Sequence, residues 1–448
     1  MSEKLVTETE QNEAVEGLKS LVSKPSVNDP ATVSKTTPFG QGIDDALTEV
    51  LKIAEENGFK TFKDPEGHYG YAEIGSGDKI FGIIGHMDVV PAGDPNDWDS
   101  DPFTATIKDG YIYGRGTQDD KGPSMAAMFA VKALVDRGYK FNCRIRFIFG
   151  TDEETLWRGI AVYNQKESSI DFGIAPDAEF PLIYAEKGLE QSYLVGPGMD
   201  DLSLDLENAF NAVPAKAPYN GPKLDEVKAS LDKHGFKYED HGTDGITVVG
   251  KAVHAMNAPQ GTNAVLRLAI ALDDVFDSPV LDFFGKKFQE DATGTNLLGN
   301  VEDEASGHLT MNISSLKIDQ KETRIQVDMR IPVTVDHDEL IEKLKKAAEP
   351  YDLHYEAFDY VAPLYVPTDS DLVKTLMSTY KDLTGDDTQP QISGGATFAR
   401  TMNNCVAYGA MLPGTPDFMH QVNENWELNS MYKAMDIYAE AIKRLCTD

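Results

Sequence analysis

The sequence predicts an α/β protein whose largely parallel sheet is interrupted by an inserted α+β region. In the first 187 residues, short apolar strands alternate with helical segments, a pattern typical of a parallel sheet. After residue 188 the pattern changes to antiparallel strands, and after residue 364 it returns to the first style. We therefore expect one domain built from residues 1–187 and 365–448, and an inserted domain of residues 188–364.

The first part of the chain supplies the expected parallel strands. Apolar residues at helical spacing predict a helix over 42–57, which Gly58 ends. The wholly apolar run 80–85 is typical of a strand buried on both faces. Further along come a hairpin about 109–110, a helix over 123–137 with Pro123 at its first position, and strands over 144–149 and 172–175.

The inserted region is predicted from strict alternation. Residues 324–331 place apolar side chains on one face and polar ones, including Arg330, on the other. Helices are expected over 263–276 and 336–348. The last part should hold a helix between Asp369 and Gly385, a strand over 405–411 and a terminal helix over 427–445.

Composition excludes several classes of protein. The 448 residues include 74 acidic and 41 basic side chains, a formal charge of -33, which repels nucleic acid and anionic membranes. The three cysteines, Cys143, Cys405 and Cys446, are odd in number and widely spaced, which argues against a disulfide framework. The N-terminal stretch carries no apolar signal segment. We expect a cytoplasmic protein that binds neither nucleic acid nor membrane.

Polar side chains follow several of the predicted strands. His86, Glu153, Glu154 and Asp177 all stand just beyond the carboxyl end of a strand. Open α/β sheets hold their ligands at that edge, so these residues should converge on one crevice.

A loop over 113–123 contains three glycines and two adjacent carboxylates, Asp119 and Asp120. Gly114, Gly116 and Gly122 permit backbone paths that side chains forbid. Taken alone, either aspartate could simply cap the helix that follows.

Each of these residues alone is more typical of a structural role. A single histidine such as His86 or His420 is most often just hydrogen-bonded, and Glu153-Glu154 could be a solvated edge. Asp88, however, stands two residues after His86, on the same side of an extended segment, as expected of a carboxylate that fixes a metal-bound imidazole. Taken together, these residues favour a metal site.

Five ordered segments resemble one family. They are residues 85–91, 114–123, 151–154, 176–177 and 420–424, and their order and spacing resemble the di-zinc exopeptidases related to aminoacylase. Within that family the chain is most similar to peptidase V-type dipeptidases, of the Xaa-His dipeptidase or carnosinase type. The resemblance spans nearly the whole chain and implies an α/β catalytic domain with an inserted α+β lid domain.

The resemblance also implies a role for each residue of the site. Asp119 would bridge two metal ions, with His86 and Asp177 completing one site and Glu154 and His420 the other. Glu153 would be the general base that activates a water between the metals, and Asp88 would orient His86. The Asp119–Asp120 peptide is implied to be cis.

Charge and ligand type agree with two divalent ions. Three carboxylates offset most of the +4 charge of two such ions and leave room for one bridging hydroxide. Imidazole and carboxylate ligands without thiolate suit Zn²⁺, with Co²⁺ or Mn²⁺ as options.

The inserted region carries the expected substrate groups. By resemblance, His254 would contact the tetrahedral oxyanion with help from Asn211, although His254 alone is more typical of a structural histidine. Arg330 would clamp the terminal carboxylate of the substrate, a task suited to a planar bidentate donor. Ser393, Gly394 and Gly395 would form a carboxylate-binding turn.

These expectations define a metal-dependent dipeptidase of broad specificity for unblocked dipeptides, Xaa-His and β-Ala-His included. One alternative is an N-acyl amino-acid deacylase such as a succinyl-diaminopimelate desuccinylase, and another is a metal-binding or regulatory protein without turnover. The insertion is long for a simple dimerisation lid, and the resemblance to peptidase V-type proteins implies that it takes the place of a second subunit, so we expect a monomer.

Overall fold

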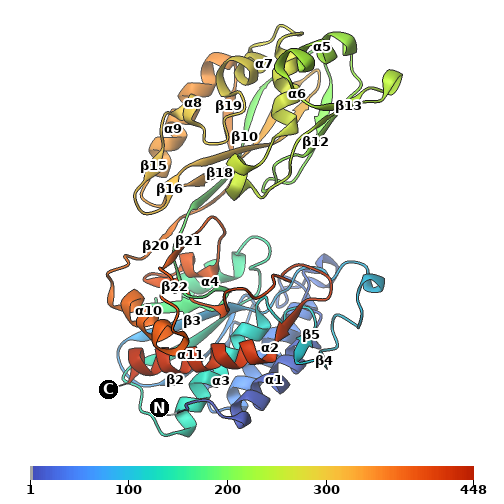
Figure 1. Cartoon of the computed structure of the whole chain (residues 1–448). Coiled ribbons are helices and arrows are strands. Elements are labelled where there is room, and N and C mark those ends of the chain that lie inside the picture. The colour runs from blue at the N-terminus through green and yellow to red at the C-terminus, as the bar shows by residue number, and fades with distance from the viewer. Residues whose placement is uncertain (1–3, 448) are drawn as a thin grey trace. The chain divides into compact units, whose positions relative to one another are not determined.

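The computed structural model describes residues 4–447, which form two compact units (Figure 1). Unit 1 comprises Met1–Tyr184, Leu364–Gln391 and Thr397–Asp448, and unit 2 comprises Ala185–Pro363 and Ile392–Ala396. Each unit has its own hydrophobic core. Within residues 4–447, no helix is both long and apolar enough to cross a membrane.

A nine-stranded sheet organises unit 1, with strand order β1-β2-β6-β3-β7-β22-β9-β20 and β21 paired to β9. The central strands β6, β3, β7 and β22 are parallel, while β1, β2 and β9 pair antiparallel. The predicted fold class is therefore confirmed. The strands are β1 (Lys60–Lys63), β2 (Gly70–Gly75), β3 (Ile80–His86), β6 (Arg144–Gly150), β7 (Phe172–Ala175), β9 (Ile183–Glu186), β20 (Leu364–Tyr365), β21 (Gln391–Ser393) and β22 (Cys405–Ala407).

Helices cover this sheet, and α3 packs against both α1 and α11 (Figure 1). The helices of unit 1 are α1 (Glu8–Val22), α2 (Gln41–Glu56), α3 (Lys121–Asp136), α4 (Arg158–Lys166), α10 (Asp371–Thr384) and α11 (Leu428–Cys446). Helix α3 begins at Lys121, so Pro123 is its third residue and not its first. Proline is still tolerated there, because first-turn N–H groups have no partner within the helix.

Short strands pair beside the main sheet. Strands β4 (Thr106–Lys108), β5 (Tyr111–Tyr113) and β24 (Asn425–Glu427) form a three-stranded sheet, and β8 (Ala178–Glu179) pairs with β23 (Ala410–Met411). The strand predicted over 405–411 is thus two strands, β22 and β23, which pair with different partners. Helix α10 is capped by Ser370, whose side chain accepts from the N–H of Val373, and not by Asp369.

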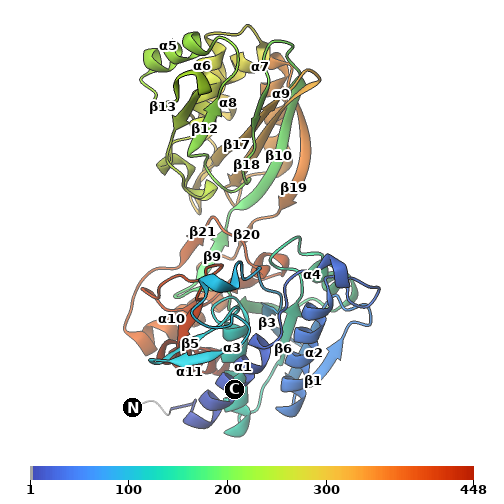
Figure 2. The same cartoon turned by 90° about the vertical axis from the view of Figure 1, so that its right-hand side faces the viewer.

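Unit 2 is built on a five-stranded antiparallel sheet, β11-β17-β18-β10-β19 (Figure 2). Its strands are β11 (Leu204–Leu206), β17 (Thr310–Ile318), β18 (Glu322–Ile331), β10 (Gly188–Pro197) and β19 (His354–Val361). Smaller sheets are formed by β12 (Lys216–Tyr219), β14 (Ile246–Val249) and β13 (Tyr238–Asp240), and by β15 (Glu302–Asp303) and β16 (Gly307–His308). The helices are α5 (Leu224–His234), α6 (Ala264–Asp273), α7 (Pro279–Asp282), α8 (Thr295–Leu298) and α9 (His337–Ala348).

The alternation predicted for β18 holds on its apolar face. Ile325, Val327, Met329 and Ile331 are all buried in the core of unit 2. The opposite face is not uniformly exposed, because Asp328 and Arg330 are also buried. Burying two charges costs desolvation free energy, so the burial of Asp328 and Arg330 indicates a role beyond stabilising the sheet.

Candidate metal centre

The parallel strands of unit 1 deliver polar side chains to one edge of the sheet. His86 is the last residue of β3, Glu153 and Glu154 follow β6, and Asp177 follows β7. The loops before α3 and before β24 add Asp119 and His420.

Asp119 lies at the centre of this group. Its Oδ1 is 2.9 Å from Nε2 of His86, and its Oδ2 is 2.9 Å from Nε2 of His420. One carboxylate therefore faces two imidazoles through different oxygens, the arrangement needed of a ligand shared by two ions.

The remaining ligand candidates divide between the two sides of Asp119. Oδ2 of Asp177 lies 3.9 Å from Nε2 of His86, and Oε2 of Glu154 lies 3.2 Å from Nε2 of His420. The five candidates thus form two sets of three, with Asp119 common to both.

The loop that carries Asp119 is fixed by its neighbour Asp120. Oδ2 of Asp120 accepts from the N–H of His86 at 3.2 Å and from Oγ of Ser124 at 3.0 Å. A Cβ on Gly85 would lie 2.4 Å from Asp120 Oδ2 and 2.3 Å from Ser124 Oγ, so only glycine leaves room for this carboxylate. The Asp119–Asp120 peptide is cis, as the resemblance implied.

Asp88 contacts His86 mainly through its main chain. Nδ1 of His86 is 2.9 Å from the carbonyl oxygen of Asp88, whereas its distance to Asp88 Oδ1 is 3.5 Å. The other carboxylate oxygen, Oδ2, accepts from the N–H of Glu154 at 3.0 Å. The residue expected to orient His86 therefore also fixes the backbone of Glu154.

The buried charges of the cluster shift the pKa values of its acids. Desolvation raises the pKa of Glu153 well above its ordinary value, and the negative charges of Glu154 and Asp119 add to the shift. Asp177 has a raised pKa for the same reasons, desolvation first and then Asp119 and Asp120. Against desolvation, hydrogen bonds from His420 and His86 lower the pKa of Asp119.

The residues present fit divalent metal ions. Ligand atoms of His86, Asp119 and Glu154 all lie within 4.8 Å of one another. Oε1 of Glu154 is buried and has no hydrogen-bond partner among residues 4–447. A buried carboxylate oxygen without a partner destabilises the fold unless a bound ligand, such as a metal ion, contacts it. Imidazole nitrogen and carboxylate oxygen form a donor set suited to zinc.

A second group, Asp64, Glu66 and His68, also brings its ligand atoms together. Here Nζ of Lys166 lies 2.8 Å from Asp64 and 3.0 Å from Glu66. An ammonium group already supplies the positive charge, so this group is a salt bridge of the fold.

Unit 2 gathers the predicted substrate residues. His254 and Asn211 lie on adjoining segments, because Ala212 pairs with His254 and the N–H of Ala255 donates to Asn211 O at 2.8 Å. Nδ1 of His254 accepts from the N–H of Met256 at 3.2 Å. Its proton is then on Nε2, and within residues 4–447 this N–H donates to no other group.

Arg330 is held by a residue that the sequence analysis did not single out. Its Nε and Nη2 donate to the two oxygens of Asp328 at 2.8 and 3.1 Å, and its Nη1 donates to Gly394 O at 2.8 Å. The alternation of β18, which places residues 328 and 330 on one face, could have revealed this pair.

The turn over 393–395 packs closely in unit 2. Oγ of Ser393 accepts from the N–H of Gly395 at 2.9 Å. A Cβ on Gly394 would lie 2.7 Å from Cβ of Met256, so glycine is required for this approach.

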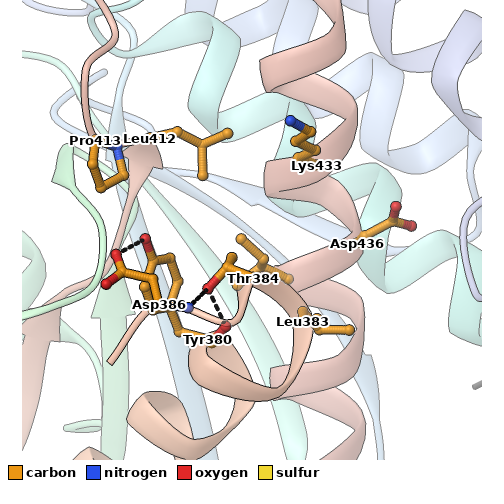
Figure 3. Close-up of a pocket in the computed structure, with 9 residues that line it drawn as sticks. Tyr380, Leu383, Thr384, Asp386, Leu412, Pro413, Lys433 and Asp436 are labelled. Atoms are coloured by element: carbon orange, nitrogen blue, oxygen red, sulfur yellow. Dashed lines mark hydrogen bonds between the residues drawn. The ribbon is translucent and has the colours of Figure 1, made fainter. Parts of the chain in front are cut away.

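A separate cavity of about 450 Å³ lies between α10 and α11 (Figure 3). In Figure 3, three of its polar residues bond to one another: Tyr380 Oη donates to Asp386 at 2.9 Å, and the N–H of Asp386 donates to Thr384 Oγ1 at 3.1 Å. It shares no residue with the metal cluster.

The α/β fold, with two imidazoles and three carboxylates gathered at the carboxyl edge of its parallel strands, defines a metal-dependent hydrolase. More narrowly, the chain belongs to peptidase family M20/M25/M40, which matches residues 82–444.

Relatives of known name agree with this assignment. The chain is 36% identical to a putative dipeptidase, YtjP, of Bacillus subtilis over 94% of both chains. It is 34% identical to a β-Ala-Xaa dipeptidase of Lactobacillus delbrueckii, covering 99% of this chain and 98% of the relative. The solved structure of aminoacylhistidine dipeptidase from Vibrio alginolyticus has the same fold, with 13% identity, a TM-score of 0.61 and 97% coverage of both chains.

Proposed function

We propose that this protein is a metal-dependent dipeptidase that hydrolyses unblocked dipeptides of broad sequence, with β-Ala-His and other Xaa-His dipeptides among its substrates. The observation that carries the proposal is the placement of Asp119, whose two oxygens each lie 2.9 Å from a different imidazole. The dipeptidase names of relatives that match nearly the full chain support this activity over N-acyl amino-acid deacylation.

The proposed cofactor is a pair of Zn²⁺ ions, with Co²⁺ or Mn²⁺ as alternatives. His86, Asp119 and Asp177 would hold one ion, and Asp119, Glu154 and His420 the other. Once bound, two such ions supply Lewis acidity that lowers the pKa of water and polarises the scissile carbonyl.

Glu153 is the proposed proton carrier. It takes a proton from the attacking water as the new C–O bond forms, and returns that proton to the amine nitrogen as the C–N bond breaks.

Unit 2 would bind the peptide. Arg330 and the turn of Ser393, Gly394 and Gly395 hold the terminal carboxylate, while His254 donates its Nε2 proton to the developing oxyanion, assisted by Asn211. A donor placed for the oxyanion contributes about 3 kcal/mol to transition-state stabilisation.

The proposal extends to organisation and location. Residues 1–187 and 365–448 would form the catalytic domain, 188–364 the lid domain, and the working enzyme would be a monomer. The proposed cytoplasmic location is supported by Cys143, Cys405 and Cys446, which are all buried and form no disulfide within residues 4–447. A stable dimer in light scattering would refute the monomer.

The experiment compares three substrates on protein stripped of metal and reloaded with Zn²⁺, Co²⁺ or Mn²⁺. β-Ala-His, its N-acetylated form and N-succinyl-diaminopimelate are incubated in parallel, and the released amine is measured. Cleavage of the free dipeptide alone supports the proposal. Cleavage of an acylated substrate alone assigns the enzyme as a deacylase, and inactivity on all three favours a protein without turnover.

A further inference from the structure

Two loops that lie far apart in the sequence are joined beside the metal centre. Residues 113–119 carry Asp119, and residues 416–425 carry His420. The loops meet where β5 and β24 pair antiparallel, with Asn425 opposite Tyr113. Glu424 of the second loop, and Gln118 and Arg115 of the first, are buried side chains that bond to the opposite loop.

The carboxylate of Glu424 is enclosed by the first loop. Its Oε1 accepts from the N–H groups of Gln118 at 2.8 Å and Asp119 at 3.3 Å. Its Oε2 accepts from the N–H of Gly116 at 3.0 Å and from Nη1 of Arg115 at 2.7 Å. The side chain is 1% exposed. Four donors, one of which is the counter-charge Arg115, compensate this buried carboxylate.

Gln118 makes the reciprocal contact. Its Nε2 donates to the carbonyl oxygens of Pro416 at 3.0 Å and Asn425 at 2.8 Å, and its Oε1 accepts from the N–H of Phe418 at 3.0 Å. The residue is 1% exposed. One carboxamide therefore binds the second loop on both sides of His420.

These contacts control one ligand pair more directly than the other. Asp119 follows Gln118 in the chain, and His420 stands between Phe418 and Glu424. His86, in contrast, stands at the end of β3, and its N–H and its ring bond to Asp120, Asp88 and Asp119. Breaking the contacts between the loops leaves the hydrogen bonds of His86 to Asp120 and Asp88 in place.

We infer that Gln118 and Glu424 are positioning residues that set the separation of Asp119 and His420. They thereby fix the affinity of the metal site that Asp119 and His420 share with Glu154. The inference rests on the proposed metal ligands, and it concerns one of the two sites.

The test is a metal titration of the Gln118→Met variant, which keeps the length of the side chain and removes its three hydrogen bonds. Metal-free protein is titrated with Co²⁺ against a competing chelator, and both dissociation constants are fitted. We expect one site of the variant to bind about 10- to 100-fold more weakly than in wild type, the usual cost of losing such a support. The other site should be unchanged.

Two backgrounds identify which site is affected. In a His86→Ala protein, where the site with Glu154 and His420 remains, Gln118→Met should weaken binding. In a His420→Ala protein the same change should have no effect. Gln421→Leu is the matched control. Among residues 4–447 the Gln421 carboxamide donates only within its own loop, to Asp417 O at 2.8 Å, so its loss should not alter either constant.

The outcomes separate the inference from the proposed function. Equal binding by wild type and Gln118→Met, or equal weakening of both sites, overturns the positioning role and leaves the dipeptidase proposal standing. Wild-type protein that binds no Co²⁺ overturns both. If Gln118→Met does not fold, as judged by circular dichroism, Gln118→Asn replaces it, because that variant keeps the carboxamide but withdraws it by one methylene group.

Discussion

Asp328 neutralises Arg330 from within the same strand. The two residues stand two positions apart on β18, and both oxygens of Asp328 accept from the guanidinium, at 2.8 and 3.1 Å. Their side chains are 0% and 5% exposed. The guanidinium is therefore held flat and oriented in advance, which reduces the conformational entropy lost when it binds a carboxylate.

Removing Asp328 should cost stability. An Asp328→Ala variant leaves the charge of Arg330 buried without its partner, so we expect a loss of about 3–5 kcal/mol in the free energy of unfolding, measured by urea denaturation. The matched control is Glu356→Ala, which removes the partner of Arg324 at 2.9 Å, where the two side chains are 33% and 42% exposed. That change should cost less than about 1 kcal/mol. If both variants lost the same free energy of unfolding, the burial of Asp328 and Arg330 would not explain the effect.

Replacing Glu153 should separate turnover from metal binding. Glu153→Gln keeps the shape of the side chain but cannot accept a proton, so kcat should fall by about 10²- to 10⁴-fold. Metal content, measured by elemental analysis, should stay at the wild-type value. Glu154→Gln is the comparison and should lower the metal content. Wild-type turnover by Glu153→Gln would remove Glu153 as the base.

Metal removal should lower stability as well as activity. The cluster buries several carboxylates close together. Desolvation and mutual repulsion raise the pKa values of Glu153 and Asp177, so the ionised carboxylates destabilise the metal-free protein. Restored metal at 100 times its dissociation constant should add about 2.7 kcal/mol to stability, seen as a higher thermal midpoint. His68→Ala, at the group that Lys166 already bridges, should leave this metal-dependent shift unchanged. A midpoint that is insensitive to metal would count against the site.

Unit 2 should lose stability as pH rises through the range in which Asp273 ionises. Desolvation, together with the neighbouring carboxyl of Asp282, raises the pKa of Asp273 from 3.8 to about 6. Because the folded pKa is raised, its contribution is present below pH 3.8 and is lost as pH increases through about 6. Asp273→Asn should therefore stabilise the protein at pH 8, on the order of 1 kcal/mol after solvent screening, and make no difference at pH 3.

The adjacent Asp274 provides a control of opposite sign. Against desolvation, hydrogen bonds from Lys233 and Ser230 lower its pKa to about 2. Asp274→Asn should destabilise the protein at pH 8, because a group with a lowered folded pKa stabilises above its unfolded value. Denaturant midpoints at pH 3 and pH 8 measure both effects. Shifts of the same sign for both variants would refute this assignment.

The sequence predicts the structure best where the order of apolar and polar side chains indicates a strand or a helix. The apolar run of β3 and its alternation with helices correctly place His86 at the edge of a parallel sheet, and the alternation of β18 puts Arg330 opposite the apolar face. The contacts of Gln118 and Glu424 could not be found in this way, because their partners are mainly backbone groups, which every residue possesses. Their loops are also separated by about 300 positions, the bond from Gln118 N–H to Glu424 spanning 306.

The lack of space beside Asp120 means that only glycine fits at position 85. A single added carbon at Gly85 would displace the carboxylate that holds the backbone N–H of His86. In a library that tests all substitutions, position 85 should therefore tolerate as little change as a metal ligand, although glycine offers the metals no ligand atom. Intolerance of substitution at position 85 would then reflect the space that the Asp120 carboxylate needs, and not a role of residue 85 in metal binding or catalysis.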